Sequence, residues 1–168
     1  LWMKKHHPEI LQESTTVFHC KDWLYFNLTG VRATDPSESV FSCGDFRHRD
    51  FSDEVIELLG LTEQKALFPK VIDGTKKYHP LSDNVAKLCG LQSGIPVMLG
   101  YVDVICTALG SGLYDPGYQT GCTIIGSTGM HMRYVDSVDE IKLNQESTGY
   151  TMVFPVDGTY SQMQSNMA

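Results

Sequence analysis

The feature that most constrains the fold is a change of pattern at residues 110–117, where the sequence GSGLYDPG holds three glycines and one proline. Helical and strand patterns alternate before this segment, and hairpin patterns dominate after it. Strands alternating with helices are typical of an α/β fold, and clustered glycine and proline interrupt regular elements. We therefore predict an α/β fold with a hinge here, dividing residues 1–110 from residues 111–168.

Before the hinge, capping and turn residues within each segment predict where helices begin and end. Residues 14–30 predict a short strand followed by a helix that ends at Gly30. Two further helices are predicted, each between a capping serine and a closing glycine: Ser52 to Gly60 and Ser82 to Gly90. Residues 31–43 predict a loop or turn around Asp35 and Pro36. Residues 95–112 predict a strand that passes into a helix.

The ends of the chain and the hairpins have their own signals. Residues 1–14 look like a helix already under way, with Pro8 interrupting it or opening the next one. Two hairpins are predicted, over residues 121–135 and over residues 148–162 with a turn at Asp157–Gly158. Residues 160–168 end in a helix-like pattern without a stop signal, so we expect a fragment of a longer protein.

Charge and composition exclude several functional classes. The net charge of −7 disfavours a nucleic-acid binder, which needs a basic face. No apolar run reaches the roughly 18 residues of a membrane span, and no signal peptide is visible. The five cysteines and six histidines show neither a CxxC pair nor an HExxH motif, so we expect a reduced cytoplasmic protein without a metal site.

Asp103 is the one acidic residue in the apolar stretch Tyr101–Ile105. A carboxylate at the C-terminal end of a core strand lies where α/β folds bind ligands, and it can act there as a general base. The alternative is an aspartate that caps the following helix.

The second candidate is the turn Gly126-Ser127-Thr128-Gly129. Backbone N–H groups in such a turn can bind phosphate oxygens, although no lysine follows as in a Walker motif. A plain hairpin turn is the alternative. Together, a base and a phosphate-binding turn across a hinge fit phosphoryl transfer to a hydroxyl.

Other polar and aromatic residues have simpler interpretations. We predict a solvated helix start at Lys21–Asp22 and a solvated loop over residues 45–50. Asp35, Ser37 and Ser39 are predicted to form a turn, with an approach to the substrate pocket as the alternative. The methionines 130 and 132 are predicted strand-core residues. Four aromatic residues are also predicted to lie in the core: Trp2, Trp23, Tyr25 and Phe26.

A series of segments resembles the FGGY carbohydrate kinases, in the order and spacing of that family. They are WMKKH, CKDWLYFNLTGVRATDPSES, LGLTEQKALFPKVIDG, LCGLQSGIPV, GYVDVICTALGSGLYDPG and TGCTIIGSTGMH. The resemblance covers essentially the whole chain. It implies an actin-like, ribonuclease-H-like ATPase fold, with residues 1–110 ending the sugar-binding domain and residues 111–168 beginning the ATP-binding domain.

The resemblance also implies the roles of the site residues. Asp103 would deprotonate the acceptor hydroxyl, with Tyr101 as a further substrate contact, and the turn Gly126–Gly129 would meet the phosphates of ATP with Mg²⁺. The resemblance also implies a small sugar or polyol as the substrate, and it leaves a homodimer as a possible oligomeric state. The sugar-contacting and adenine-binding residues would lie mostly outside this chain.

Two departures from the family pattern narrow the expected class of substrate. Val104 follows Asp103 where the family often has Asn or Gln, and Tyr101–Val102 replace a Gly-Gly pair. This favours xylulose-type kinases of the L-xylulose subset, with polyol kinases also open. Two alternatives remain: a non-catalytic nucleotide-binding or regulatory protein of the actin-like superfamily, and an unrelated α/β binding module.

Overall fold

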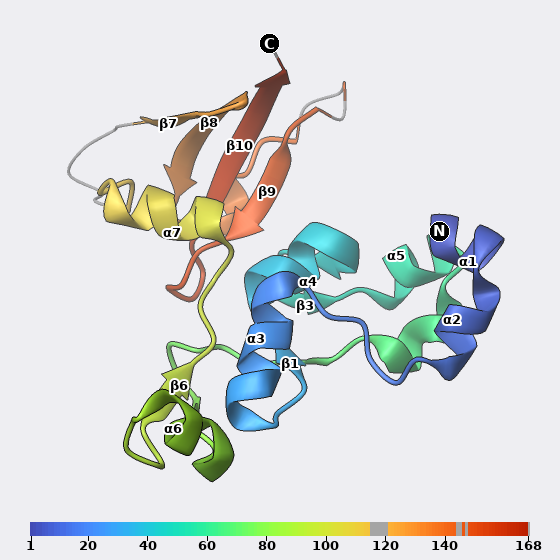
Figure 1. The fold of residues 1–168 in the computed structure, drawn as a ribbon. Coiled ribbons are helices and arrows are strands. Elements are labelled where there is room, and N and C mark those ends of the chain that lie inside the picture. Colours follow the sequence, from blue (N-terminus) through green and yellow to red (C-terminus); the bar gives the residue numbers. More distant parts are fainter. Residues whose placement is uncertain (115–120, 144–145, 147, 168) are drawn as a thin grey trace.

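The computed structural model describes residues 1–114, 121–143, 146 and 148–167. Figure 1 shows a four-stranded sheet with helix α7 (Asp103–Gly110) below it, and a separate region of short helices and two-stranded sheets. The elements of that second region are α1 (Trp2–His6), α2 (Pro8–Glu13), α3 (Cys20–Thr29), β1 (Ala33–Thr34), α4 (Pro36–Cys43), β2 (Gly44–Asp45), β3 (Asp50–Phe51), α5 (Asp53–Leu58), the 3₁₀ helix Thr62–Leu67, β4 (Lys70–Val71), β5 (Tyr78–Pro80), α6 (Asp83–Cys89) and β6 (Pro96–Met98).

The four-stranded sheet is antiparallel throughout, in the order β7-β8-β10-β9. Both predicted hairpins are confirmed, since β7 pairs with β8 and β9 pairs with β10. The second hairpin turns where Gly158 adopts a φ of 75°. The remaining elements are α7 (Asp103–Gly110), β7 (Gly121–Ile125), β8 (Thr128–Val135), the 3₁₀ helix Val138–Glu140, β9 (Tyr150–Val153) and β10 (Tyr160–Met167).

The helix-like interpretation of residues 160–168 was wrong, because Tyr160–Met167 form the inner strand β10. This strand pairs with β8 from Tyr160 to Met167 and with β9 on its other edge. Pairing on both edges satisfies its backbone groups from distant residues, which outweighs a local helical pattern.

The predicted loop at residues 31–43 was also wrong. Ala33–Thr34 form β1 in parallel with β4, and helix α4 follows at once. Asp35 is the N-cap of α4 and accepts a hydrogen bond from the Ser37 N–H at 2.8 Å, while Pro36 takes the first helical position. An Asp-Pro pair therefore starts a helix here, using the same side-chain geometry that would serve a turn.

The other predicted helices are confirmed. Helix α3 ends at Gly30, whose φ of 76° is the left-handed conformation that glycine adopts without strain. Ser52 caps α5 by accepting from the Val55 N–H, and Pro8 opens α2. No strand precedes α3 at residues 14–19. The predicted hinge is partly outside the described residues, because residues 115–117 belong to the stretch 115–120.

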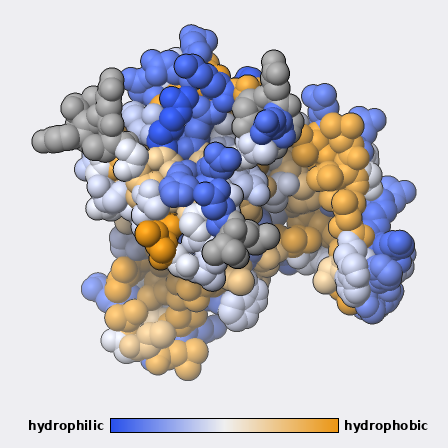
Figure 2. All heavy atoms as spheres, turned by 90° about the horizontal axis from the view of Figure 1, so that it is seen from above, coloured by the Kyte–Doolittle hydropathy of each residue, from blue (hydrophilic) through white to orange (hydrophobic). Residues whose placement is uncertain are grey.

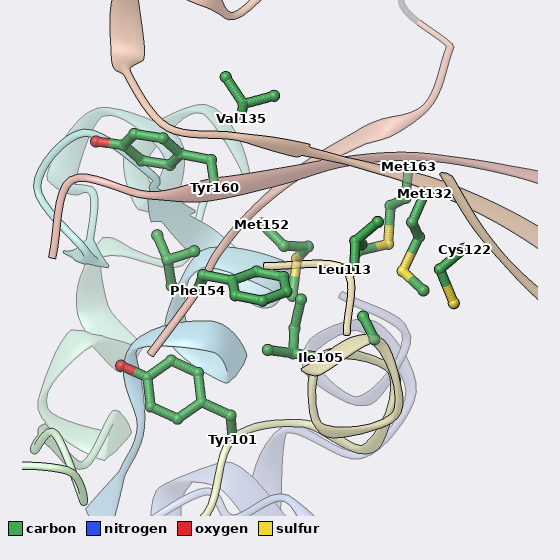
Figure 3. Close-up of a cluster of buried hydrophobic side chains, with 12 residues drawn as sticks. Tyr101, Ile105, Leu113, Cys122, Met132, Val135, Met152, Phe154, Tyr160 and Met163 are labelled. Atoms are coloured by element: carbon green, nitrogen blue, oxygen red, sulfur yellow. The ribbon is translucent and has the colours of Figure 1, made fainter. Parts of the chain in front are cut away.

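The main hydrophobic core lies between α7 and the sheet. Figure 3 shows Ile105 of α7 facing Met152 and Phe154, all three with at most 2% of their surface exposed. A smaller cluster joins Tyr25, Ala33, Ile72 and Leu99. Helix α7 therefore packs with the C-terminal sheet.

The prediction of a core role was right for Tyr25 and Met132 and wrong for Trp2 and Trp23. The two tryptophans are 65% and 59% exposed. Figure 2 shows further apolar side chains at the surface; Leu58 of α5, Leu88 of α6 and Ile125 of β7 are each at least 80% exposed. Within the described part of the chain, no helix is long and apolar enough to cross a membrane.

Candidate functional site

Asp103 is the first residue of α7, and its side chain is exposed. Its Oδ1 accepts a hydrogen bond from the Val104 N–H at 2.7 Å. The prediction that Asp103 ends a core strand was wrong, because β6 stops at Met98 and pairs only with β5 in a separate two-stranded sheet. The N-cap of α7 is Val102, so Asp103 lies one residue inside the helix instead of capping it.

The apolar spacing of the sequence explains why a helix begins here. Ile105 and Ala108 are fully buried, and Val104 and Leu109 pack beside them, which forms one apolar face of α7. Asp103 lies off that face in the first turn, where a carboxylate is favoured by the helix dipole. The carboxylate therefore remains accessible to a ligand while the helix behind it is fixed by the core.

The turn between β7 and β8 is exposed at Gly126, Ser127 and Thr128. Ile125 pairs with Gly129, and the Gly126 N–H donates to the Thr128 carbonyl at 3.0 Å. Among the described residues, the Ser127 N–H and the hydroxyls of Ser127 and Thr128 have no hydrogen-bond partner. The tip of this hairpin thus presents free donors to solvent.

The fold does not require glycine at either end of this turn. Neither Gly126 nor Gly129 has a positive φ. A Cβ at Gly126 would come no closer than 3.9 Å to any atom, and one at Gly129 no closer than 3.8 Å, which are ordinary contacts. The absence of side chains here therefore leaves the backbone open to close approach by a ligand.

Tyr101, the third predicted site residue, is 6% exposed and belongs to the main core. Its hydroxyl accepts a hydrogen bond from Arg49 Nη2 at 2.8 Å, and burial raises the pKa of Tyr101. This position leaves little of its surface for a substrate to contact.

Arg49 joins the two regions of the molecule. The solvated-loop prediction for residues 45–50 was wrong for this residue, since the same Nη2 also donates to the Phe154 carbonyl at 2.8 Å. Arg49 adopts a φ of 57°, which is uncommon for a residue other than glycine. The guanidinium therefore connects the β2–β3 turn to both Tyr101 and the end of β9.

A buried charged cluster lies next to the start of α7, and the sequence did not predict it. Lys21 contacts Asp22 at 3.0 Å and forms an ion pair with Asp35, and both carboxylates are 0% exposed. The solvated helix start predicted for Lys21–Asp22 was therefore wrong. The Asp35 carboxylate also accepts from the hydroxyl of Ser37, which in turn accepts from the Val102 N–H at 2.9 Å.

The cluster is electrostatically compensated. Burial raises the pKa of Asp22, but the hydrogen bond from His19 and the charge of Lys21 together outweigh burial and lower it. The hydrogen bond to Asp22 raises the pKa of His19. Burial opposes the charge of Lys21, yet Asp35 raises the pKa of Lys21 overall. Buried charges persist when they are paired in this way.

Asp103 and the turn lie on one helix–hairpin unit but do not touch. In Figure 1, α7 runs away from Asp103 and β7 returns in the opposite sense towards the turn. No hydrogen bond or ion pair between described residues joins the two. A groove of about 810 Å³ lies elsewhere, between Val40 and Phe46 on one side and β8–β10 on the other, and contains neither.

Metal ligands are not clustered in the part of the chain that the structure describes, where no group of three or more His, Cys, Asp or Glu side chains could hold an ion. Of the five cysteines, all unpaired, Cys43 and Cys122 are buried and the others are exposed.

The amino-acid sequence is similar to those of known carbohydrate kinases. Residues 1–110 match the model of the FGGY family of carbohydrate kinases, N-terminal domain. The erythritol kinase of Brucella abortus (strain 2308) is 52% identical over 160 residues, which are 95% of this chain and 31% of that protein. An autoinducer-2 kinase of Escherichia coli (strain SMS-3-5 / SECEC) is 33% identical over 129 residues, covering 76% of this chain and 23% of that kinase.

Solved structures share the fold. A xyloylose kinase from Brucella ovis superposes with a TM-score of 0.83 at 24% identity, covering 99% of this chain and 33% of its own. The xylulose kinase from Rhodospirillum rubrum gives 0.79 at 22% identity, with the same two coverages. The chain thus spans about a third or less of the length of the relatives it matches, and it has the α/β fold of the corresponding third of these structures.

Proposed function

Because this chain belongs to the FGGY family of carbohydrate kinases, we propose that it is part of an enzyme that transfers the terminal phosphoryl group of ATP to a hydroxyl of a polyol or sugar. The observation that carries the proposal is the exposed carboxylate of Asp103, at the start of a helix whose other face is fixed in the core. A non-catalytic relative would have no need of that carboxylate.

Asp103 acts as the general base in this proposal. As the acceptor oxygen attacks the terminal phosphorus of ATP, its proton passes to the Asp103 carboxylate, and the bond from phosphorus to the bridging oxygen of ADP breaks. The products are the phosphorylated alcohol, ADP and one proton. Exposure of Asp103 supports this role, because a hydroxyl can reach it without displacing protein atoms.

The turn Gly126–Gly129 is proposed to bind the phosphates of ATP. The unpartnered Ser127 N–H and hydroxyls of the turn are suitable donors to phosphate oxygens, and the glycines leave room for close approach. A Mg²⁺ ion bound with ATP would neutralise phosphate charge during the transfer.

The domain roles are proposed from the same relationship. Residues 1–110 would complete the sugar-binding domain and residues 111–168 would begin the ATP-binding domain of an actin-like fold. The match of the N-terminal-domain model to residues 1–110 supports the first assignment.

We propose a polyol acceptor, with a four-carbon polyol such as erythritol ahead of a ketose such as xylulose. The 52% identity with an erythritol kinase over nearly the whole chain supports this order. The identities of 24% and 22% to the xylulose-type kinase structures are much lower and support the fold alone.

The test is ADP release by the protein produced from its whole reading frame, with MgATP and a panel of polyols and ketoses. We expect turnover with erythritol to exceed turnover with D- and L-xylulose in kcat/KM. Preference for a ketose would contradict the substrate, and ADP release with no member of the panel would favour the nucleotide-binding or regulatory alternative.

The turn gives a separate prediction. Gly129→Val should raise the KM for ATP by about tenfold, because a side chain next to the turn weakens hydrogen bonds to a charged phosphate. The backbone at Gly129 should tolerate a side chain, because its φ is not positive and a Cβ would make only ordinary contacts at 3.8 and 3.9 Å. Steady-state kinetics with varied ATP measure the effect, and Gly110→Val at the end of α7 is the control, because a Cβ there would meet no atom within 4 Å. An unchanged KM for ATP would remove the turn from the phosphate site.

A further inference from the structure

The segment that carries Asp103 is attached to a buried polar side chain from a distant part of the chain. Ser37, 65 residues upstream, accepts a hydrogen bond from the N–H of Val102, the residue directly before Asp103. Val102 is the N-cap of α7, so its N–H precedes the helix and has no helical partner. Ser37 therefore fixes the point at which α7 begins.

The hydroxyl of Ser37 has little freedom. It donates to Asp35 Oδ1 while it accepts from Val102, so its one hydrogen is committed. Asp35 also accepts from the Ser37 N–H and is paired with Lys21. Both Ser37 and Asp35 are 0% exposed, which prevents water from substituting for either partner.

The polar chain has a rigid origin. Lys21 is held between the carboxylates of Asp22 and Asp35, and Asp22 is held by His19 at the start of α3. The contacts thus run from α3 through the N-terminus of α4 to the N-terminus of α7. None of these groups touches Asp103 itself, so any effect on chemistry must act through the position of its backbone.

We propose that Ser37 is a positioning residue for the general base Asp103, an inference that rests on the proposed kinase function. Through the Val102 N–H, the buried Lys21–Asp35–Ser37 chain holds the first turn of α7 in the orientation that directs the Asp103 carboxylate at the acceptor hydroxyl. Loss of this hydrogen bond lets the base move relative to its substrate, and displacements of about 1 Å cost roughly a hundredfold in rate.

The test compares two buried serines of the same helix in the protein from the whole reading frame. Ser37→Ala should lower kcat by about tenfold to a hundredfold with little change in the KM for ATP, because the phosphate site is elsewhere. Ser39→Ala is the matched control, since Ser39 is also 0% exposed and its hydroxyl donates to the Pro36 carbonyl at 3.0 Å, without a hydrogen bond to α7. Ser37→Thr keeps the hydroxyl and should restore most of kcat.

A double variant tests whether Ser37 acts through Asp103. If Ser37 only positions the base, Ser37→Ala should lower kcat in the parent but should change the residual kcat of Asp103→Asn very little. Steady-state ADP release by the parent, the two single variants and the double variant measures this coupling.

Failure of this inference is distinguishable from failure of the proposed function. If Asp103→Asn is inactive but Ser37→Ala has the same kcat as Ser39→Ala, the positioning role is wrong and the kinase proposal stands. If Ser37→Ala lowers kcat by the same factor with and without Asp103→Asn, the positioning role is also wrong. If Asp103→Asn is as active as the parent, both proposals fall.

Discussion

Replacement of Asp103 by asparagine is expected to lower kcat for phosphoryl transfer by about 10²- to 10⁴-fold, the usual contribution of a general base. Asparagine keeps the side-chain oxygen that accepts from the Val104 N–H but cannot take up the proton. The side chain is exposed, so the midpoint of thermal unfolding should change little. A catalytic loss without a stability loss is thus the expected signature.

The measurement is steady-state ADP release with the best acceptor, together with thermal unfolding of both proteins. Asp53→Asn provides the control, because Asp53 is likewise an exposed aspartate at the first position of a helix. We expect that variant to keep parental kcat. If Asp103→Asn and Asp53→Asn are equally active, the carboxylate at position 103 serves only the helix dipole, and the mechanism proposed above is wrong.

Truncation of Phe154 to alanine is expected to lower the free energy of unfolding by about 3–5 kcal/mol. Phe154 is 0% exposed and packs in the core between α7 and the sheet (Figure 3). The centroid of its ring lies 5.7 Å from that of Tyr134, and the two rings are nearly perpendicular. The substitution removes this ring contact and leaves a cavity that the surrounding strands can close only in part.

Urea unfolding of the protein from the whole reading frame measures this loss. Phe154→Leu should cost less, because more of the volume is kept, and Val156→Ala should be within about 0.5 kcal/mol of the parent since Val156 is 56% exposed. Equal stability of Phe154→Ala and Val156→Ala would show that the cluster around α7 contributes little to folding.

Local signals account for the parts of the fold that the sequence predicted. Gly30, Ser52 and the Asp157–Gly158 turn each act within a few residues, so a single sequence contains the needed information. Strand β10 was mistaken for a helix because only its first residues, Tyr160–Met163, pair with the neighbouring strand β9, whereas its whole length pairs with β8, which lies about 25 residues or more upstream. The start of α4 at Asp35–Pro36 was mistaken because helix caps and turns share the same residues.

The candidate site divides in the same way. Asp103 and the turn Gly126–Gly129 were singled out from their residue types and their place in the sequence, the family resemblance implied their roles, and those roles stay predictions. The Lys21–Asp35–Ser37 chain was missed because burial of Asp22 and Asp35 depends on contacts between α3 and the start of α4, which no local pattern encodes. The only available signal was Asp35 directly before Pro36, a pair that favours a helix N-terminus over a turn once the residues are buried.

The contacts of Arg49 have a consequence for motion. Its guanidinium is bonded at once to Tyr101, at the entrance to α7, and to Phe154, at the exit of β9. A movement of the sheet away from the β2–β3 turn has to break one or both of these hydrogen bonds. Arg49 therefore resists separation of that turn from the segments that lead into α7 and out of β9.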